Sequence, residues 1–248
     1  LKPTAFTGGI ALSIIFILSN FFFDISGKLN LIIAIAFLIA IVGFIDDKHH
    51  LNVAGKLSLQ VIIISYLIVF EDYEFLKTDL NSFAIPLTLL SVIFLINSFN
   101  YFDGLDGTLS FTTISVLGVL YFLINDENTR LFLIIILLPI LIFLFFNFSI
   151  FKLPKLFLGD SGSLLLGFII SFSLIHIADY NNVHPILLAW TISIFVYEFL
   201  SINIIRLNSK KNIFKANLDH LHHILKIKYK SLLLTNLLMV IMNLIFFM

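Results

Sequence analysis

The sequence has no cysteine and one tryptophan, and only 12% of its residues are charged. Without cysteine, disulfide bonds and thiolate metal sites are excluded. About a quarter of the residues in an ordinary soluble domain are charged, so this low content argues against a water-soluble fold. The 15 basic and 15 acidic residues balance, and a net charge of zero gives no reason to expect a nucleic-acid partner.

Apolar residues fill most of the sequence, at 60% of the total with a mean hydropathy of +1.08. About 20 apolar residues cross a bilayer, and roughly 17 suffice. The runs that meet or approach this length are 8–23, 30–45, 57–70, 83–98, 109–124, 131–148, 163–178, 185–206 and 231–248. We therefore expect an all-α, polytopic membrane helix bundle of roughly nine transmembrane helices, forming a single domain over residues 1–248.

Basic residues gather in alternate connections between these runs. The connections 1–7, 46–56, 99–108, 149–162 and 207–230, with Arg206 at the edge of the last, carry 12 of the 15 Lys and Arg residues. The other connections carry the remaining three. The positive-inside rule predicts that the first set is cytoplasmic.

Two neighbouring acids, Asp46 and Asp47, end the second apolar run after Gly43. Adjacent helical residues point about 100° apart, so the two carboxylates cannot ligate one ion symmetrically. One can face a metal or phosphate while the other orients a cation or takes a proton. A plain helix exit is the alternative, but acids at a helix C-terminus oppose the macrodipole.

A stripe of polar side chains follows the fourth run, at Asn97, Asn100, Asp103 and Asp106. A spacing of three puts them along one side of a helix or helix-like turn. Glycines at 104 and 107 allow close backbone approach. The stripe indicates a metal or nucleotide site, with a polar turn as the alternative.

The segment from Phe157 to Ser163 holds one acid, Asp160, at the start of the seventh run. Asp and Ser are common N-caps, so the acid can simply cap the helix. A helix N-terminus also binds phosphate through its free N–H groups, and an acid beside it can hold Mg²⁺. The residues alone leave both interpretations open.

Three histidines, His220, His222 and His223, follow a basic run in the longest cytoplasmic connection. Imidazoles beside basic residues suit a polyanion. They are also potential zinc ligands, although zinc requires wider spacing or a fourth ligand. The alternative is a basic loop that contacts anionic membrane lipid.

Two further charged residues are candidates. Lys56, at the start of the third run, is a phosphate contact or an interface anchor. Glu198 lies inside a run, and a carboxylate there is a functional candidate by default. The sequence does not indicate its partner.

These motifs, in this order, resemble the polyprenyl-phosphate N-acetylhexosamine-1-phosphate transferases of the glycosyl transferase family 4 type. The resemblance extends from Lys2 to at least Leu225. The His-x-His-His form resembles the GlcNAc-1-phosphate branch more than the peptidoglycan branch, which typically has three consecutive histidines. Family members often carry an acid–base pair just before this motif, where the chain has Asn-Leu-Asp at 217–219. The opening resembles the segment after the family's first span, so we expect one helix to be missing there, and the C-terminal end to be shortened.

The resemblance implies transfer of N-acetylhexosamine-1-phosphate from a UDP-N-acetylhexosamine, first of all UDP-GlcNAc, to undecaprenyl phosphate at the cytoplasmic face, with release of UMP. It implies Mg²⁺, with Mn²⁺ as an alternative, held by Asp160 and Asn100. It also implies membrane lipid around the protein and leaves a homodimer open. The implied catalytic residues are Asp46, Asp47, Asp103, Asp160, His220, His222 and His223. The implied substrate contacts are Lys56 with the diphosphate, Asp106 and Phe157 with uracil, and Arg206 with the sugar phosphate.

Two alternatives remain at this point. One is transfer of phospho-MurNAc-pentapeptide in peptidoglycan synthesis, against which the form of the histidine motif argues. The other is an ion-coupled transporter, whose polar groups would lie near the bilayer midplane, often within inverted repeats. The acids here cluster at one face instead, with Glu198 as the exception.

Overall fold

The computed structural model describes residues 7–71, 73, 81–181, 183–209 and 220–247. These residues form helices joined by short loops, which confirms the all-α expectation. The helices are α1 (Gly8–Ser19), α2 (Gly27–His49), α3 (Val53–Phe70), α4 (Asn81–Phe102), α5 (Thr108–Leu123), α6 (Glu127–Asn147), a 3-10 turn η1 (Ile150–Lys152), α7 (Gly159–Tyr180), α8 (Pro185–Thr191), α9 (Ser193–Asn208), α10 (Leu221–Tyr229) and α11 (Leu232–Phe247).

Five helices are long and apolar enough to cross a membrane, namely α2, α3, α4, α6 and α7. The pair α8 and α9 becomes a sixth span if its two halves are counted together. The shorter α1, α5 and α11 are also apolar. Each expected run therefore corresponds to a helix or to the bent pair. The number of nine spans is not confirmed and stays a prediction.

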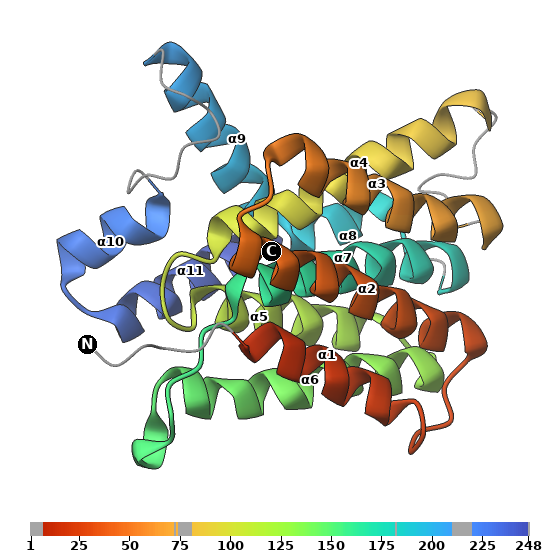
Figure 1. Ribbon diagram of the computed structural model, residues 1–248, viewed down its shortest axis with the longest axis horizontal. Helices are drawn as coiled ribbons and strands as arrows, with labels where there is room; N and C mark the ends of the chain where they lie inside the picture. Colours follow the sequence, from red (N-terminus) through yellow and green to blue (C-terminus); the bar gives the residue numbers. More distant parts are fainter. Residues whose placement is uncertain (1–6, 72, 74–80, 182, 210–219, 248) are drawn as a thin grey trace.

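Helix α7 lies at the centre of the bundle and is the most buried span, at 94% of its apolar window. It packs against α2, α4 and α1 (Figure 1). Two glycines allow this close packing. A Cβ at Gly9 would clash with the backbone of Gly162, and a Cβ at Gly43 would clash with the backbone of Asp160. Helices α1 and α2 therefore approach α7 at backbone distance near its N-terminal end.

A polar cluster joins the start of α2 to the end of α7. Lys28 donates to the Tyr180 hydroxyl at 2.6 Å and lies over the Tyr73 ring. The Tyr73 hydroxyl lies 3.3 Å from Nδ1 of His176, which is 5% exposed. His176 is thus buried among these groups. The cluster fixes α2 against α7 at the end remote from Asp46 and Asp160.

The expected single span 185–206 is broken at Ile192. Helices α8 and α9 meet there at 68°. The bend directs α9 toward α10, a short amphipathic helix within the connection that we expected to be a loop (Figure 1). This arrangement brings Glu198 of α9 against the first residues of α10.

Candidate active site

The carboxylate of Asp47, at the end of α2, caps α7. It accepts the backbone N–H groups of Asp160 at 3.0 Å and Ser161 at 3.2 Å. Asp160 therefore does not cap its own helix, and two N–H groups that the sequence offered to a phosphate are bonded to Asp47 instead. Asp160 as a ligand of Mg²⁺ stays a prediction. Gly159 has φ +70, and a Cβ there would lie against the Asp47 carboxylate. Glycine permits both the backbone conformation and the contact.

Lys56 joins two carboxylates from different helices. Its Nζ lies 2.7 Å from Asp46 Oδ2 and 2.5 Å from Asp160 Oδ2. The other oxygen of Asp46 accepts the Leu51 N–H at 2.8 Å. The other oxygen of Asp160 accepts the Asn100 amide N–H at 2.9 Å. α2, α3, α4 and α7 therefore meet at one fixed cluster of charges, which we call the lysine bridge (Lys56, Asp46 and Asp160).

Two polar cavities lie next to the lysine bridge. The first, of about 380 Å³, is the carboxylate cavity, and its acidic lining residues are Asp47, Asp103, Asp106 and Asp160. The second, of about 320 Å³, is the lysine cavity, and its polar lining includes Asp46, Lys56, Asn97 and Asn100. Asp46 and Asp47 line different cavities, as expected from their divergence on a helix.

The predicted stripe from Asn97 to Asp106 is only partly correct. Helix α4 ends at Phe102, so Asp103 and Asp106 line the cavity from a loop. The Asn97 amide donates to Gln60 at 3.0 Å and lies on the lysine cavity. Gly107 has φ +76, a left-handed backbone conformation that a right-handed helix cannot contain, so the chain turns here between α4 and α5.

Asp103 lies outside the helices among like charges. Burial and then the negative charges of Asp160, Asp47 and Asp106 raise the pKa of its carboxyl to about 8. Burial is the larger cause of this shift, and the three neighbouring carboxylates add to it. A bound cation would therefore be favourable in the carboxylate cavity.

Asp106 is held by residues that the sequence did not single out. Lys155 Nζ lies 2.6 Å from its Oδ2 and 4.8 Å from the centre of the Phe157 ring. Asn236 of α11 donates to the Asp106 carbonyl at 2.9 Å and accepts from the Thr108 hydroxyl at 2.6 Å. An amide inside an apolar run was the available signal for Asn236.

The oxygen-rich lining fits a hard divalent cation, because Mg²⁺ prefers carboxylates and water. The Asp160 carboxylate is held by Lys56 at Oδ2 and by Asn100 at Oδ1. Asn100 as second ligand would present its amide oxygen to the ion, whereas in the structure its amide nitrogen faces Asp160 and Ser163.

The histidines form a second centre beside the loop 103–107. His222 is completely buried, and its Nε2 packs against Gly104, where a Cβ would clash with it. Burial, followed by the neighbouring histidines, lowers the pKa of His222 to about 3 and also lowers the pKa of the half-buried His223. His220 is 8% exposed and lies edge-on to Tyr101. The buried Arg206 lies over the same Tyr101 ring at 5.4 Å.

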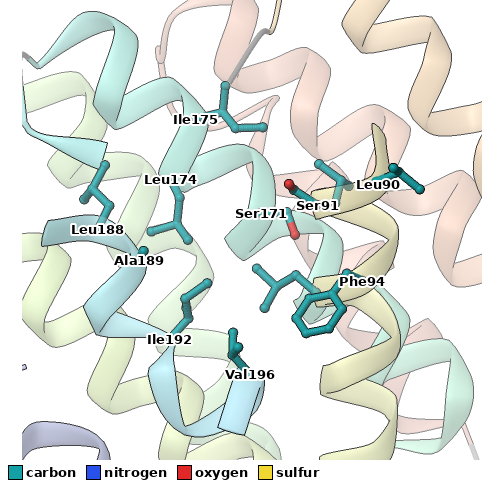
Figure 2. A pocket seen from close by; sticks show the side chains of 12 residues that line it. Leu90, Ser91, Phe94, Ser171, Leu174, Ile175, Leu188, Ala189, Ile192 and Val196 are labelled. Carbon is teal, nitrogen blue, oxygen red and sulfur yellow. The ribbon is translucent and has the colours of Figure 1, made fainter. Parts of the chain in front are cut away.

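An apolar cavity of about 490 Å³ lies between α4, α7 and the α8–α9 pair, farther along these helices from the charged end. Figure 2 shows its side chains converging from α4, α7 and the α8–α9 pair. Phe94 lines both this cavity and the lysine cavity, and its ring packs edge-on against Phe199 at 4.9 Å. Apolar and charged binding space therefore adjoin at Phe94.

The structure thus brings the predicted acids, Lys56, Asn100 and Phe157 to one end of the bundle, with the histidine cluster beside them. The chain belongs to glycosyl transferase family 4, because the profile of that family matches residues 29–178. It is a multi-pass membrane protein.

Individual relatives come from two branches. The chain is 26% identical over 211 residues to the undecaprenyl-phosphate alpha-N-acetylglucosaminyl 1-phosphate transferase of Escherichia coli strain K12, covering 79% of this chain and 58% of the relative. It is 30% identical over 204 residues to a probable undecaprenyl-phosphate N-acetylglucosaminyl 1-phosphate transferase of Bacillus subtilis, covering 76% and 55%. It is 31% identical over 248 residues to the phospho-N-acetylmuramoyl-pentapeptide-transferase of Staphylococcus epidermidis, covering 87% and 74%. The chain therefore spans little more than half the length of the N-acetylglucosaminyl relatives.

Proposed function

We propose that the protein transfers N-acetylhexosamine-1-phosphate, first of all GlcNAc-1-phosphate, from a UDP-sugar to undecaprenyl phosphate at the cytoplasmic membrane face. The observation that carries this proposal is the pair of cavities on either side of the lysine bridge. One is rich in carboxylates, and the other adjoins apolar space. A transferase that joins a charged nucleotide sugar to a lipid phosphate needs both kinds of space.

The nucleotide sugar occupies the carboxylate cavity in this proposal. Asp160, which lines this cavity, would hold Mg²⁺ together with Asn100, which lines the adjoining lysine cavity, and the ion would supply charge neutralisation on the diphosphate. Asp106 and Phe157 hold the uracil, beside Lys155. Arg206 and His223, the least buried of the three histidines, contact the sugar phosphate. A cation also relieves the repulsion that raises the pKa of Asp103.

The carrier phosphate occupies the lysine cavity. Lys56, whose Nζ lies between Asp46 and Asp160, attracts this phosphate as well as the diphosphate in the adjoining cavity. Asp46 takes the remaining proton of the carrier phosphate or orients it. The prenyl chain passes Phe94 into the apolar cavity (Figure 2). This arrangement keeps the charged head at the membrane face and the tail among apolar side chains.

The reaction is a single displacement at phosphorus. A carrier phosphate oxygen attacks the β-phosphorus of the UDP-sugar, and the bond from that phosphorus to the bridging oxygen breaks. UMP leaves with the bridging oxygen, and the product is a polyprenyl diphosphate-sugar. Positioning and charge stabilisation supply most of the catalysis in such transfers.

A second candidate donor is UDP-MurNAc-pentapeptide. It is favoured by the Staphylococcus epidermidis relative, which aligns over more of both chains than the two N-acetylglucosaminyl relatives do. Peptide and sugar would then be recognised outside the carboxylate cavity, with the diphosphate contacts unchanged.

The test is UMP release by detergent-solubilised protein from each UDP-sugar, with and without undecaprenyl phosphate and Mg²⁺. Release from UDP-GlcNAc that needs both additions supports the proposal. Release from UDP-MurNAc-pentapeptide alone identifies the second candidate. No UMP from either donor, with folded protein and both additions present, overturns the transferase proposal. Movement of a solute without UMP release would identify a transporter.

Asp160→Asn should reduce UMP release by at least about 100-fold, because it removes a charged ligand of the proposed ion. Asp24→Asn is the matched control, since Asp24 is exposed at the other end of the bundle and should keep its rate. If the Asp160→Asn protein keeps most of its rate of UMP release, Asp160 is not a ligand of the ion.

A further inference from the structure

The sequence left Glu198 without a partner, and the structure surrounds it with histidines. Glu198 is 1% exposed. Its Oε1 lies 3.3 Å from His220 Nδ1 and 4.0 Å from His222 Nδ1. One ligand atom from each of the three residues lies within 4.8 Å of the others. All three side chains are buried, so this is an enclosed group rather than a surface cluster.

The buried imidazoles lack hydrogen-bond partners. Both ring nitrogens of His222 and Nδ1 of His220 have none among the residues that the structure describes. A neutral histidine has one donor and one acceptor, and burying either unpaired costs free energy. His222 is 0% exposed, and its Nδ1 faces the Glu198 carboxylate. A missing ligand is therefore indicated at this position.

We propose that Glu198, His220 and His222 form a binding site for a divalent transition-metal ion, with zinc as the first choice. Two imidazoles and one carboxylate are a known zinc ligand set that leaves the fourth position open. Zinc bonds of about 2.0–2.2 Å put tetrahedral ligand atoms roughly 3.3 Å apart. The Glu198 to His220 separation already has this value, and the Glu198 to His222 separation is longer, at 4.0 Å.

The local structure supports the carboxylate in the orientation that the ion requires. The Leu221 N–H donates to Glu198 Oε1 at 2.8 Å, which ties the first turn of α10 to α9. Outer hydrogen bonds of this kind orient metal ligands. The ion would stabilise the contact between α9 and α10 and offset the buried negative charge of Glu198.

This site differs chemically from the proposed Mg²⁺ site at Asp160. Imidazole ligands favour zinc and its neighbours, whereas carboxylates and water favour Mg²⁺. An excess of Mg²⁺ should therefore leave zinc bound at Glu198, His220 and His222. Metal content is measured without turnover, so the inference does not depend on the proposed transferase function.

The experiment measures zinc by mass spectrometry in protein purified without a histidine tag, equilibrated with Zn²⁺ and desalted in excess Mg²⁺. About one zinc per chain is expected for the wild type. Glu198→Gln and His222→Gln should weaken zinc affinity at least about tenfold. His49→Gln is the matched control, because His49 is exposed at the end of α2. This variant should bind zinc as the wild type does.

A second measurement guards against variants that do not fold. Added Zn²⁺ should raise the melting temperature of chelator-treated wild-type protein, and Co²⁺ should give the visible absorption of a tetrahedral nitrogen–oxygen site. Neither effect should occur in folded Glu198→Gln protein. Folded wild-type protein that binds no zinc overturns the proposal. So does equal zinc content in wild type, Glu198→Gln and His222→Gln.

Discussion

Lys56 is the shared cation of two carboxylates, Asp46 near the end of α2 and Asp160 in the first turn of α7. Its side chain is 13% exposed, while the carboxylates that it contacts are 13% exposed in Asp46 and 34% exposed in Asp160. Removing it leaves both carboxylates without their shared cation. Breaking a fully buried pair costs about 3–5 kcal/mol, and partial exposure reduces this.

We expect Lys56→Met to lower the free energy of unfolding by about 1–3 kcal/mol. UMP release should fall by about 100-fold or more, because a charge that stabilises the reacting phosphates is lost. Equilibrium unfolding in detergent and the UMP assay measure the two effects. Lys48→Met, at an exposed lysine of α2, should change neither by much. Equal behaviour of the two variants would refute the role of the lysine bridge.

The carboxyl of Asp103 gives a dependence of stability on pH. Its pKa is raised from 3.8 to about 8 in the folded protein, so folding favours the protonated form. Ionisation therefore destabilises the folded state progressively from about pH 4 to about pH 8, with the full penalty above that. Asp103→Asn removes this penalty.

The melting temperature of Asp103→Asn relative to wild type should accordingly rise across that interval and level off above about pH 8. The measurement is made in EDTA, so that no divalent ion occupies the cavity. A constant difference at every pH would mean that Asp103 ionises normally.

At the residue scale the sequence predicted most of the site's acids but few of their partners. Asp46, Asp47, Lys56 and Asp160 stood out because charges at the ends of apolar runs are rare. The bond from Asp160 N–H to Asp47 joins residues 113 positions apart. Such a contact depends on how α2 and α7 pack, which no local pattern contains. The same holds for Glu198 and His220.

Among the elements, α1 and α7 approach most closely at their glycines. A Cβ at Gly9 would meet the backbone of Gly162, and backbone cannot rotate away as a side chain can. Gly8 and Gly9 also donate their N–H groups to the carbonyls of Phe157 and Leu158 at 3.0 Å. Separating α1 from α7 would therefore break the hydrogen bonds that hold Phe157 and Leu158, the residues that lead to Asp160.

Gly9→Ala should destabilise the protein by about 1–3 kcal/mol, as overpacked cores do. Gly118→Ala is the control, because nothing lies within 4 Å of a Cβ there and alanine favours the helix by up to about 1 kcal/mol. Unfolding in detergent compares the two. A Gly9→Ala protein as stable as Gly118→Ala would show that α1 can shift without cost.

The helices themselves were largely predictable, because membrane spans are defined by runs of apolar residues. Their ends were less so: α2 continues past the expected end at 45 to His49, where charged residues still fit the helix. The bend at Ile192 and the helix α10 were missed. The apolar run through Ile192 is uninterrupted, and α10, with nine residues that include two histidines and two lysines, is too short and too polar to resemble a span.

For the whole molecule, the charge bias predicts which end faces the cytoplasm. Helix α6 has 21 residues and is about 30 Å long, so Glu127 at its start and Lys152 beyond its end lie on opposite sides of a membrane. The 248 residues include no cysteine, so single cysteines can be introduced without removing others.

A membrane-impermeant maleimide should label Glu127→Cys in intact cells and Lys152→Cys only in inverted vesicles. Both residues are exposed, so lack of labelling would not result from burial. Labelling of both from the same side would break the topology that unites the acids at one membrane face.

The divergence of Asp46 and Asp47 has a consequence for kinetics. Because the two carboxylates line separate cavities, the proposed nucleotide and lipid substrates would be able to bind in either order. In that proposal each would reach the lysine bridge from its own phase, water or membrane. Occupancy of one cavity then leaves the other open, so a compound that fills only the lipid side would reduce turnover without competing for the nucleotide.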